Sequence, residues 1–392
     1  MSDSAHLSGP LIPAMANVHS HAFQRDMRGA AERISARSAS DDFWSWRQAM
    51  FAAVAALDPE QMHTVALATY TEMAAAGYGT VGEFHYVHHQ PDGRPYEDPN
   101  AMAKALAQAA LEAGLQIVLL PAAYHRGGFS DGADLAPGPG QLRFCDPDVE
   151  VFLERVDQLR AWADSQAGVQ VGIAAHSVRA VPASWLAPIA QYAQAHSLVA
   201  HVHAQEQPRE LAECRAEHGC TPIELLERSG FLGPRTTVVH AIHVSDADVN
   251  RLARSRTIVA ACPTTEANLG DGFFPAIRYR DAGVRVAIGS DSNVRIDPFE
   301  ETRELETLAR RLSVSRNGLL AASGDLWGEL AANGAASLGL GAAPGRELRI
   351  DMSHPSIRGI AEADLPYALA TCAQPGIIAT PSPAGGPHRH EH

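Results

Sequence analysis

Lysine is almost missing from this chain. Among 392 residues there is one lysine, Lys104, and it lies in the helical pattern AMAKALAQAALEAG. Clusters of basic residues are also missing, and the formal net charge is −14. A strongly negative chain without a basic patch is not expected to bind nucleic acid or an anionic membrane surface. A small anionic substrate would therefore need arginine side chains inside its binding site.

Cysteines are few, and long apolar runs are lacking. The five cysteines contain no C-x-x-C pair and are scattered over Cys145, Cys214, Cys220, Cys262 and Cys372. This arrangement fits neither a disulfide framework nor a cysteine zinc site. No apolar run approaches the roughly 20 residues that cross a bilayer, and the amino terminus lacks the basic start and apolar core of a signal peptide. We therefore expect a cytoplasmic protein with no membrane partner.

Short apolar runs and longer amphipathic runs alternate along most of the chain. Eight runs have the composition of buried strands: MANVHSH, TVGEFHYV, LQIVLLPAAY, VQVGIAAHS, LVAHVHAQE, TTVVHAIH, TIVAACPT and VRVAIGSDS. Patterns with helical periodicity, such as PEQMHTVALATYTEMAAAG and FEETRELETLARRL, lie between them. Strand then helix, eight times over, predicts an α/β fold, a (β/α)8 barrel of TIM type.

The barrel is expected to occupy residues 13–340. Residues 1–12 are interpreted as an N-terminal tail, 341–378 as a short C-terminal segment and 379–392 as a disordered tail. The connection 22–58 is long and contains DDFWSWRQAMF, so we expect a lid or pocket wall there. The Gly-rich segment HRGGFSDGADLAPGPGQ, after the third strand, is expected to be a mobile loop.

Polar residues gather at the carboxyl ends of the predicted strands, where barrel enzymes place their functional groups. They are His19, His21, Glu83, His85, Tyr86, His176, His201, His203, His240, His243 and Asp291. The H-x-H pair puts two imidazoles on one face of a strand, because side chains alternate with period two. His203 and Asp291 would complete a set of ligands that leaves a position for water, as a catalytic zinc requires. The alternative is that these residues serve only in packing, which explains so many ionisable side chains at the ends of strands poorly.

The place of Lys104 bears on the number of metal ions. Barrel hydrolases with two metals often bridge them with a carboxylated lysine from the fourth strand. Lys104 lies far from any strand end, so this sequence has no such lysine. We expect one zinc ion per chain, although the same ligands would accept iron, manganese or cobalt.

Several segments resemble one known family. In the order of the chain, NVHSHAFQRDMRG, DDFWSWRQAMF, GEFHYVHHQPDGRPY, AAHSVRAV, HVHAQEQ, CPTTEANLGDGFFP and IGSDSNV are similar to motifs of the amidohydrolase superfamily. The FHYVHH and CPTTEANLGDG stretches are specific to its formimidoylglutamate deiminase family. The resemblance implies a metal-dependent hydrolase of amidine C–N bonds, active in histidine degradation and assembled as a homodimer. The implied reaction converts N-formimino-L-glutamate to N-formyl-L-glutamate and ammonia by means of metal-activated water.

The resemblance also implies roles for individual residues. The implied metal ligands are His19, His21, His203 and Asp291. The implied substrate contacts are Gln24, Arg47, Tyr86, His176 and Arg179. Asp291 would accept the proton of the attacking water, Glu206 would protonate the departing nitrogen, and His240 would stabilise the tetrahedral intermediate. Arg47 and Arg179 would bind the carboxylates of a dicarboxylate substrate.

Some of these positions have other interpretations. The less favoured interpretation of Arg47 is an arginine in solvent or stacked on aromatic rings. Without the resemblance, Tyr86 is equally a packing residue and Gln24 a loop cap. The remaining strand-end histidines are expected behind the site or at the surface: His85, His88, His89, His201 and His243. A further set is expected to shape the loop after the seventh strand: Thr264, Glu266, Asn268 and Asp271.

The ends of the chain depart from the family pattern. Family members usually begin with several dozen residues of a small β-sandwich that the chain completes after the barrel. Here the first strand starts almost at once, so we expect a reduced or incomplete remnant of that sandwich.

Two other functions stay open. One is a related aminohydrolase that acts on another amidine or on a heteroaromatic ring. The other is a non-catalytic paralogue that binds metal without turnover, against which the intact set of Glu206, His240 and Asp291 argues.

Overall fold

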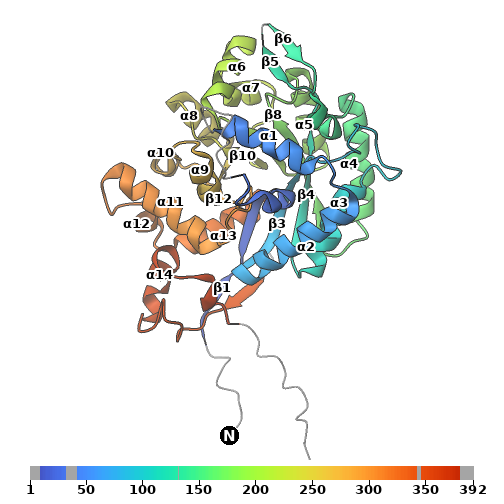
Figure 1. Cartoon of the computed structure of the whole chain (residues 1–392). Helices are drawn as coiled ribbons and strands as arrows, with labels where there is room; N and C mark the ends of the chain where they lie inside the picture. The colour runs from blue at the N-terminus through green and yellow to red at the C-terminus, as the bar shows by residue number, and fades with distance from the viewer. Residues whose placement is uncertain (1–8, 32–41, 131, 342–345, 380–392) are drawn as a thin grey trace, which may run out of the picture.

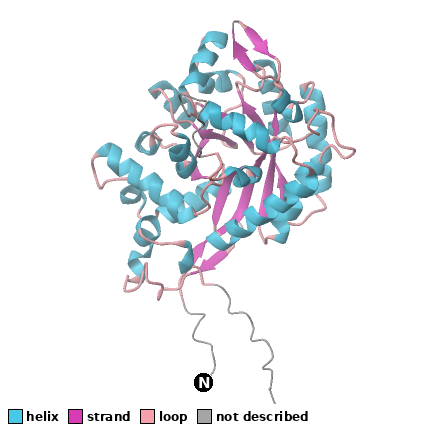
Figure 2. Cartoon of the chain, in the orientation of Figure 1, coloured by secondary structure: helices cyan, strands magenta, loops and turns pink. Residues whose placement is uncertain are grey.

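The computed structural model describes residues 9–31, 42–130, 132–341 and 346–379. Parallel strands lie in the centre and helices surround them (Figures 1 and 2). The eight barrel strands are β2 (Met15–Ser20), β3 (Tyr78–His85), β4 (Gln116–Ala123), β8 (Ile173–Ser177), β9 (Ala200–Ala204), β10 (Thr236–His240), β11 (Ile258–Ala261) and β12 (Val286–Ile288). They pair in the order of the chain, and a parallel bridge between Ser20 and Asp291 joins the last strand region to the first. The predicted (β/α)8 barrel is therefore confirmed.

Each of the eight segments predicted as strands overlaps one barrel strand. The fourth is preceded by a short strand, β7 (Val169–Val171), which pairs with β4 and ends just before Gly172. A Cβ at Gly172 would lie 2.7 Å from a methyl of Leu120 and 2.8 Å from the carbonyl oxygen of Val199. Only glycine therefore allows the neighbouring strands to approach at this point.

Helices follow the strands on the outside of the barrel. They are α2 (Pro59–Ala76), α3 (Ala101–Glu112), α4 (Val149–Ala163), α5 (Ala183–Ala195), α6 (Pro208–His218), α7 (Pro222–Arg228), α8 (Asp246–Ser255), α9 (Pro263–Leu269), α10 (Ala276–Ala282) and α11 (Pro298–Ser313). The two ends of these helices carry ordinary capping residues, as α2 illustrates. The Asp58 side chain accepts a hydrogen bond from the backbone N–H of Gln61 at the start of α2, and Gly77 ends this helix with a φ of 109°.

The long first connection forms one wall of the barrel mouth. It contains a 3-10 helix, η2 (Ala22–Met27), and the helix α1 (Phe43–Val54), while residues 32–41 lie outside the described part. The Asp42 side chain caps α1 by accepting hydrogen bonds from the backbone N–H groups of Trp44 and Ser45. In Figure 1, α1 crosses in front of the strands.

The Gly-rich segment after β4 has more regular structure than expected. It forms an antiparallel hairpin of β5 (Gly128–Ser130) and β6 (Ala133–Leu135), followed by η3 (Pro139–Phe144). The buried Arg126 makes ion pairs with Asp134 and Glu217 and thereby ties the hairpin to α6.

The chain after α11 closes the amino-terminal end of the barrel. It forms α12 (Leu319–Ser323), α13 (Leu326–Ser337), β13 (Glu347–Arg349), η4 (Glu362–Asp364), α14 (Leu365–Thr371) and η5 (Pro375–Ile377). Helix α13 packs against β2 and β12. Strand β1 (Leu11–Pro13) pairs antiparallel with β13, which makes a two-stranded sheet of the two ends of the described chain. Most of the predicted tails, residues 1–8 and 380–392, lies outside the described part.

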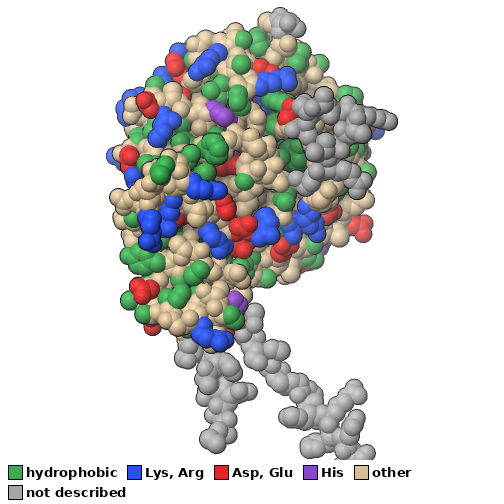
Figure 3. All heavy atoms as spheres, turned by 60° about the vertical axis from the view of Figure 1, so that its left-hand side comes forward, with side chains coloured by type: hydrophobic (Ala, Val, Ile, Leu, Met, Phe, Trp, Pro, Cys, Tyr) green, Lys and Arg blue, Asp and Glu red, His purple; other side chains and the backbone are tan. Residues whose placement is uncertain are grey.

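The surface mixes charges of both signs. On the face shown in Figure 3, basic and acidic side chains lie next to one another and neither covers a large continuous area. Within the described ranges, none of the helices has both the length and the apolar composition that a membrane crossing requires.

Candidate metal and active site

The four predicted metal ligands converge at the carboxyl end of the barrel. His19 and His21 come from the end of β2, His203 from β9, and Asp291 from the turn after β12. The Nε2 atoms of His19 and His203 are 3.0 Å apart. Oδ1 of Asp291 lies 3.4 Å from Nε2 of both His19 and His21. Ligands that surround one zinc ion with bonds of about 2.0–2.1 Å are separated by roughly 3.3 Å, so these spacings suit a single ion.

The protonation of the histidines also suits a cation. Nδ1 of His21 donates to the carbonyl oxygen of Phe84 at 2.8 Å, and Nδ1 of His203 donates to that of His176 at 2.8 Å. Each ring nitrogen that faces a carbonyl must carry hydrogen, which leaves a lone pair on Nε2. Burial lowers the pKa of His19 to about 3 and lowers the pKa of His21 and His203, so the rings are neutral. Lone pairs that point at each other and at a carboxylate repel unless a cation lies between them, and these residues therefore fit a bound divalent metal.

Asp291 is ionised in this setting. Burial alone would raise the pKa of Asp291, but its interactions with His19, His240 and His21 lower it below its usual range. The residue has a φ of 50°, a left-handed conformation that is uncommon for a side chain other than glycine. Such a conformation persists where the surrounding contacts hold it, and it is frequent at functional sites.

A buried network of hydrogen bonds holds Asp291 against β2. The backbone N–H of Asp291 donates to the carbonyl of His19, and the N–H of His21 donates to the carbonyl of Asp291, both at 2.9 Å. Nδ2 of Asn17 donates to Oγ of Ser290 at 2.6 Å, and Nδ2 of Asn293 donates to the carbonyl of His21 at 3.1 Å. The same contacts that close the barrel thus set the positions of three ligands.

Glu206 and His240, the predicted acid–base residues, lie beside the ligands. Nε2 of His240 is 3.6 Å from Oε1 of Glu206 and 3.8 Å from Oδ2 of Asp291. Burial alone would lower the pKa of His240, but Glu206, a hydrogen bond to Glu266, and Asp291 together raise it to about 10. Burial raises the pKa of Glu206. Each of these two groups therefore binds a proton more tightly than it would in water.

A pocket opens above these residues. The five predicted substrate contacts all line it: Gln24, Arg47, Tyr86, His176 and Arg179. Side chains of α1 and α9 complete the lining: Phe43, Trp46, Met50 and Leu269. His21, His203, Glu206, His240 and Asp291 form its floor.

Three polar atoms of the pocket residues have no hydrogen-bond partner among the described residues, and two of them belong to predicted substrate contacts. Nε of the buried Arg179 lacks an acceptor, and Oε1 of Gln24 lacks a donor although its Nε2 donates to the hydroxyl of Tyr86 at 3.0 Å. A buried polar group without a hydrogen bond costs about 1–3 kcal/mol, so both atoms favour a ligand that supplies an anionic acceptor and an N–H donor.

The two arginines are held in different ways. A guanidinium nitrogen of Arg47 donates to the hydroxyl of Tyr124 at 2.9 Å, and the group lies 5.0 Å from the ring centre of Phe51. The guanidinium of Arg179 lies 5.4 Å from the ring centre of Trp44. Arg47 therefore both stacks on an aromatic ring and lines the pocket.

Four of the five remaining strand-end histidines have polar partners other than the proposed metal ligands: His88, His89, His201 and His243. Nε2 of His88 donates to the carbonyl of Ala122 at 2.9 Å, and Nε2 of His201 faces that of Ser337 at 3.1 Å. His243 is half-buried and the others are buried, so none of the five is an exposed surface residue.

Two residues near the site had not been assigned a role there. Tyr124, at the end of β4, binds Arg47, and its place at a strand end was a signal in the sequence. Glu266, expected only to shape the loop after β11, places Oε1 3.3 Å from Nδ1 of His240. Of the other residues expected in that loop, Thr264 donates to Glu301.

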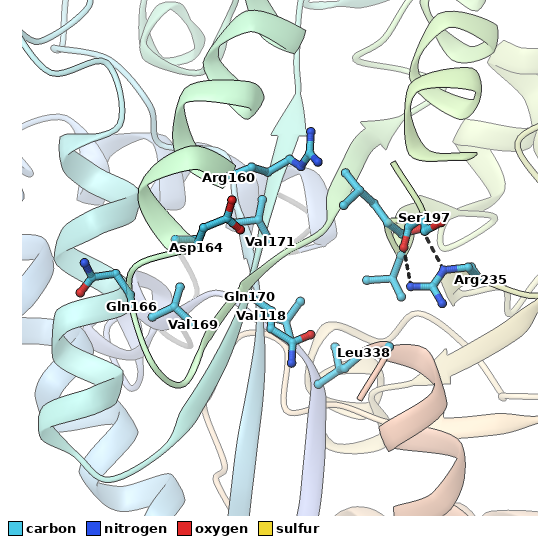
Figure 4. Close-up of a pocket in the computed structure, with 14 residues that line it drawn as sticks. Val118, Arg160, Asp164, Gln166, Val169, Gln170, Val171, Ser197, Arg235 and Leu338 are labelled. Carbon is cyan, nitrogen blue, oxygen red and sulfur yellow. Dashed lines mark hydrogen bonds between the residues drawn. The ribbon is translucent and has the colours of Figure 1, made fainter. Parts of the chain in front are cut away.

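A larger pocket lies at the opposite, amino-terminal end of the barrel (Figure 4). Its arginines are already engaged: Arg235 donates to the carbonyl of Ser197 at 2.6 Å, and Arg160 donates to Asp157 and Tyr192 at 2.9 Å. The clusters of possible metal ligands among the described residues all lie at the carboxyl end instead. Chemistry, and not pocket size, therefore identifies the active site.

Comparison with known proteins agrees with this site. The model of the amidohydrolase family matches residues 11–341, and the chain belongs to this family. It is 42% identical to formimidoylglutamate deiminase of Pseudomonas aeruginosa over 314 residues, which are 80% of this chain and 67% of the relative. The sequence resemblance is thereby confirmed. The protein is a hydrolase that acts on C–N bonds, in a family that depends on metal ions.

Solved structures give the same fold. An amidohydrolase from Brucella melitensis, 35% identical, superimposes with a TM-score of 0.85 and covers 94% of this chain and 84% of its own. An adenosine deaminase from Xanthomonas campestris with bound zinc, 21% identical, has a TM-score of 0.75 and covers 94% of this chain and 78% of its own.

Proposed function

We propose that this protein hydrolyses the formimino group of N-formimino-L-glutamate and releases N-formyl-L-glutamate and ammonia, with one zinc ion per chain. Water adds to the formimino carbon, the bond from that carbon to the terminal nitrogen breaks, and the nitrogen leaves as ammonia. The observation that carries the proposal is the pair of arginines, Arg47 and Arg179, above a hydrolytic site in a strongly acidic chain. A substrate with carboxylates explains them, and an uncharged ring does not.

The ligand set of His19, His21, His203 and Asp291 would hold the metal. A divalent ion supplies Lewis acidity there and lowers the pKa of water from 15.7 to about 7. All other steps belong to side chains. Asp291 is ionised and lines the pocket beside the other ligands, so its carboxylate can take a proton from water.

Glu206 and His240 serve the departing nitrogen and the developing charge. Because burial raises the pKa of Glu206, its carboxyl group can hold a proton and give it to the leaving nitrogen. Nε2 of His240 has no hydrogen-bond partner among the described residues and is free to donate to the reacting atoms. Gln24 Oε1 would accept an N–H of the amidine, and Arg179 Nε would donate to a carboxylate.

Ammonia release by purified, metal-quantified protein tests this proposal. We expect turnover of N-formimino-L-glutamate, slower turnover of N-formimino-L-aspartate, and none of guanine or cytosine. Hydrolysis of a nucleobase without either formimino substrate would favour the related aminohydrolase. Metal bound without turnover of any of the four would favour a binding protein. From the family resemblance we also propose a homodimer in the cytoplasm, which sedimentation and cell fractionation would test.

A further inference from the structure

We propose that Glu266 is a positioning residue for the hydrolysis: its carboxylate holds the imidazole of His240 through Nδ1 and thereby fixes the direction of Nε2. The proposal deepens the proposed function, because it rests on the role given there to His240. Glu266 does not line the pocket, so it acts through His240 and not on the substrate.

The contacts determine which way the imidazole of His240 faces. Oε1 of Glu266 lies 3.3 Å from Nδ1, and the two residues are 3% and 0% exposed. The same Oε1 accepts the backbone N–H of Cys262 at 2.9 Å, which fixes the carboxylate in place. A carboxylate that accepts in this way requires an N–H on Nδ1, so Nε2 faces Glu206 and Asp291.

Glu266 is attached to a rigid support. It lies in the first turn of α9, and the neighbouring residues of that turn are themselves bound. The backbone N–H of Thr264 donates to the buried Glu301 at 3.0 Å, and the hydroxyl of Thr265 donates to the carbonyl of Ser290 at 3.1 Å. One short helix therefore connects the ring of His240 to the turn that carries Asp291.

The ring of His240 lies beside His203 and Glu206, but its one hydrogen bond among the described residues is to Glu266. The residue sits in a left-handed conformation, with a φ of 69°, at the end of β10. Its Nε2 has no hydrogen-bond partner among the described residues, and Glu266 provides the hydrogen bond of the ring. Without that bond the ring can turn over and exchange Nδ1 for a carbon, which would remove the N–H from its proper place.

Steady-state kinetics of Glu266 variants test the proposal. Glu266→Gln keeps the acceptor oxygen but loses its charge, and Glu266→Ala loses both. We expect kcat to fall about 10-fold in the first and about 100-fold in the second, with KM and bound metal almost unchanged. In a His240→Asn background, Glu266→Gln should change the residual kcat less than about two-fold, because its effect passes through the missing ring.

A matched control separates positioning from support of the loop. Glu301→Gln makes the same chemical change in a buried carboxyl group that binds Thr264 and does not contact His240. We expect it to keep the parent kcat. A wild-type kcat in Glu266→Ala, a rise of KM alone in Glu266→Gln, or an equal loss of kcat in the His240→Asn background would each overturn the proposal.

A spectroscopic measurement tests whether Glu266 binds Nδ1 of His240, and it requires no substrate. In protein labelled with 15N at the histidine rings, an imidazole N–H bound to a carboxylate gives a proton resonance far downfield. His89 also faces a carboxylate, that of Asp146, so its signal is expected in every variant. We expect the parent and Glu301→Gln to share a further signal that is missing from both Glu266→Ala and His240→Asn. Its persistence in Glu266→Ala would overturn the proposal. Because no turnover is required, a wrong substrate assignment and a wrong role for Glu266 give different results.

Discussion

The carboxyl group of Glu83 makes the stability of the folded protein depend on pH, and the direction of this dependence can be predicted. Glu83 lies in β3 next to the metal-binding strand, is 1% exposed, and accepts the backbone N–H of Ala22 at 2.7 Å. Burial raises its pKa from 4.5 to about 8, although hydrogen bonds from Ala22, Ser20 and Tyr70 act in the opposite direction. The side chain is therefore protonated in the folded protein at neutral pH.

The raised pKa of Glu83 determines how the stability of the folded protein changes with pH. A group that binds its proton more tightly in the folded state stabilises the fold fully below the unfolded pKa, and this contribution is lost as the pH rises through the folded pKa. For Glu83 the window runs from pH 4.5 to about 8. Each pKa unit corresponds to about 1.4 kcal/mol, so the whole shift is worth at most about 5 kcal/mol, of which about 4 kcal/mol is lost between about pH 5 and pH 9.

Glu83→Gln should remove this dependence. Glutamine has the shape of the protonated side chain, so we expect parent and variant to have similar unfolding free energies at about pH 5 and the variant to be more stable by about 2–4 kcal/mol at about pH 9. Urea denaturation of the metal-free protein at several pH values measures the difference. Glu112→Gln, at a half-exposed position, serves as control. Parallel pH curves for Glu83→Gln and the parent would refute a buried, protonated Glu83.

Three further perturbations address the pocket and the metal. Arg179→Met should raise KM for the formimino substrate about 10- to 100-fold, with less effect on kcat, because it removes a charged hydrogen bond to a carboxylate. Tyr124→Phe should raise KM about 3- to 10-fold, since Arg47 loses the hydrogen bond that holds it. Chelation should destabilise the protein by about 2.7 kcal/mol relative to metal at 100 times its Kd, and His203→Asn should abolish this difference.

Each of these predictions has its own control. Arg209 also stacks on Trp44 but does not line the pocket, so Arg209→Met should leave KM unchanged. An equal rise of KM in both arginine variants would show that the aromatic stack, and not the charge, is what Arg179 contributes. A KM in Tyr124→Phe equal to that of the parent would mean that Arg47 is held by its stacking alone. Melting temperature with and without chelator provides the metal test, and equal values in the parent would contradict a bound ion.

The convergence of the metal ligands could be predicted because two simple rules combine. Buried parallel strands have nearly continuous apolar sequences, which marks their ends, and all carboxyl ends of a parallel barrel meet at one mouth. His19, His203 and Asp291 each follow such a run, so their meeting required only the correct order of strands. The positions of residues on strands therefore follow from the order of the strands in the sheet.

The positions of residues on helices and loops do not follow from the order of the strands. Glu266 lies on the short helix α9. No spacing in the sequence indicates that the first turn of this helix lies over the end of β10, where Glu266 contacts His240. The hairpin of β5 and β6 was also missed, because its glycines indicate only a turn, while its place depends on the ion pairs of Arg126 with Asp134 and Glu217. Such contacts between distant segments are set by packing and not by local pattern.

The bridge from Ser20 to Asp291 has a consequence for the order of events in the cell. The ligands come from the first and the last strand of the barrel, and Asp291 reaches them only when these two strands are joined. A growing chain that has not yet released residue 291 from the ribosome cannot assemble the complete set. The complete ligand set therefore forms late in synthesis, and an ion bound there would join the first strand region of the barrel to the last.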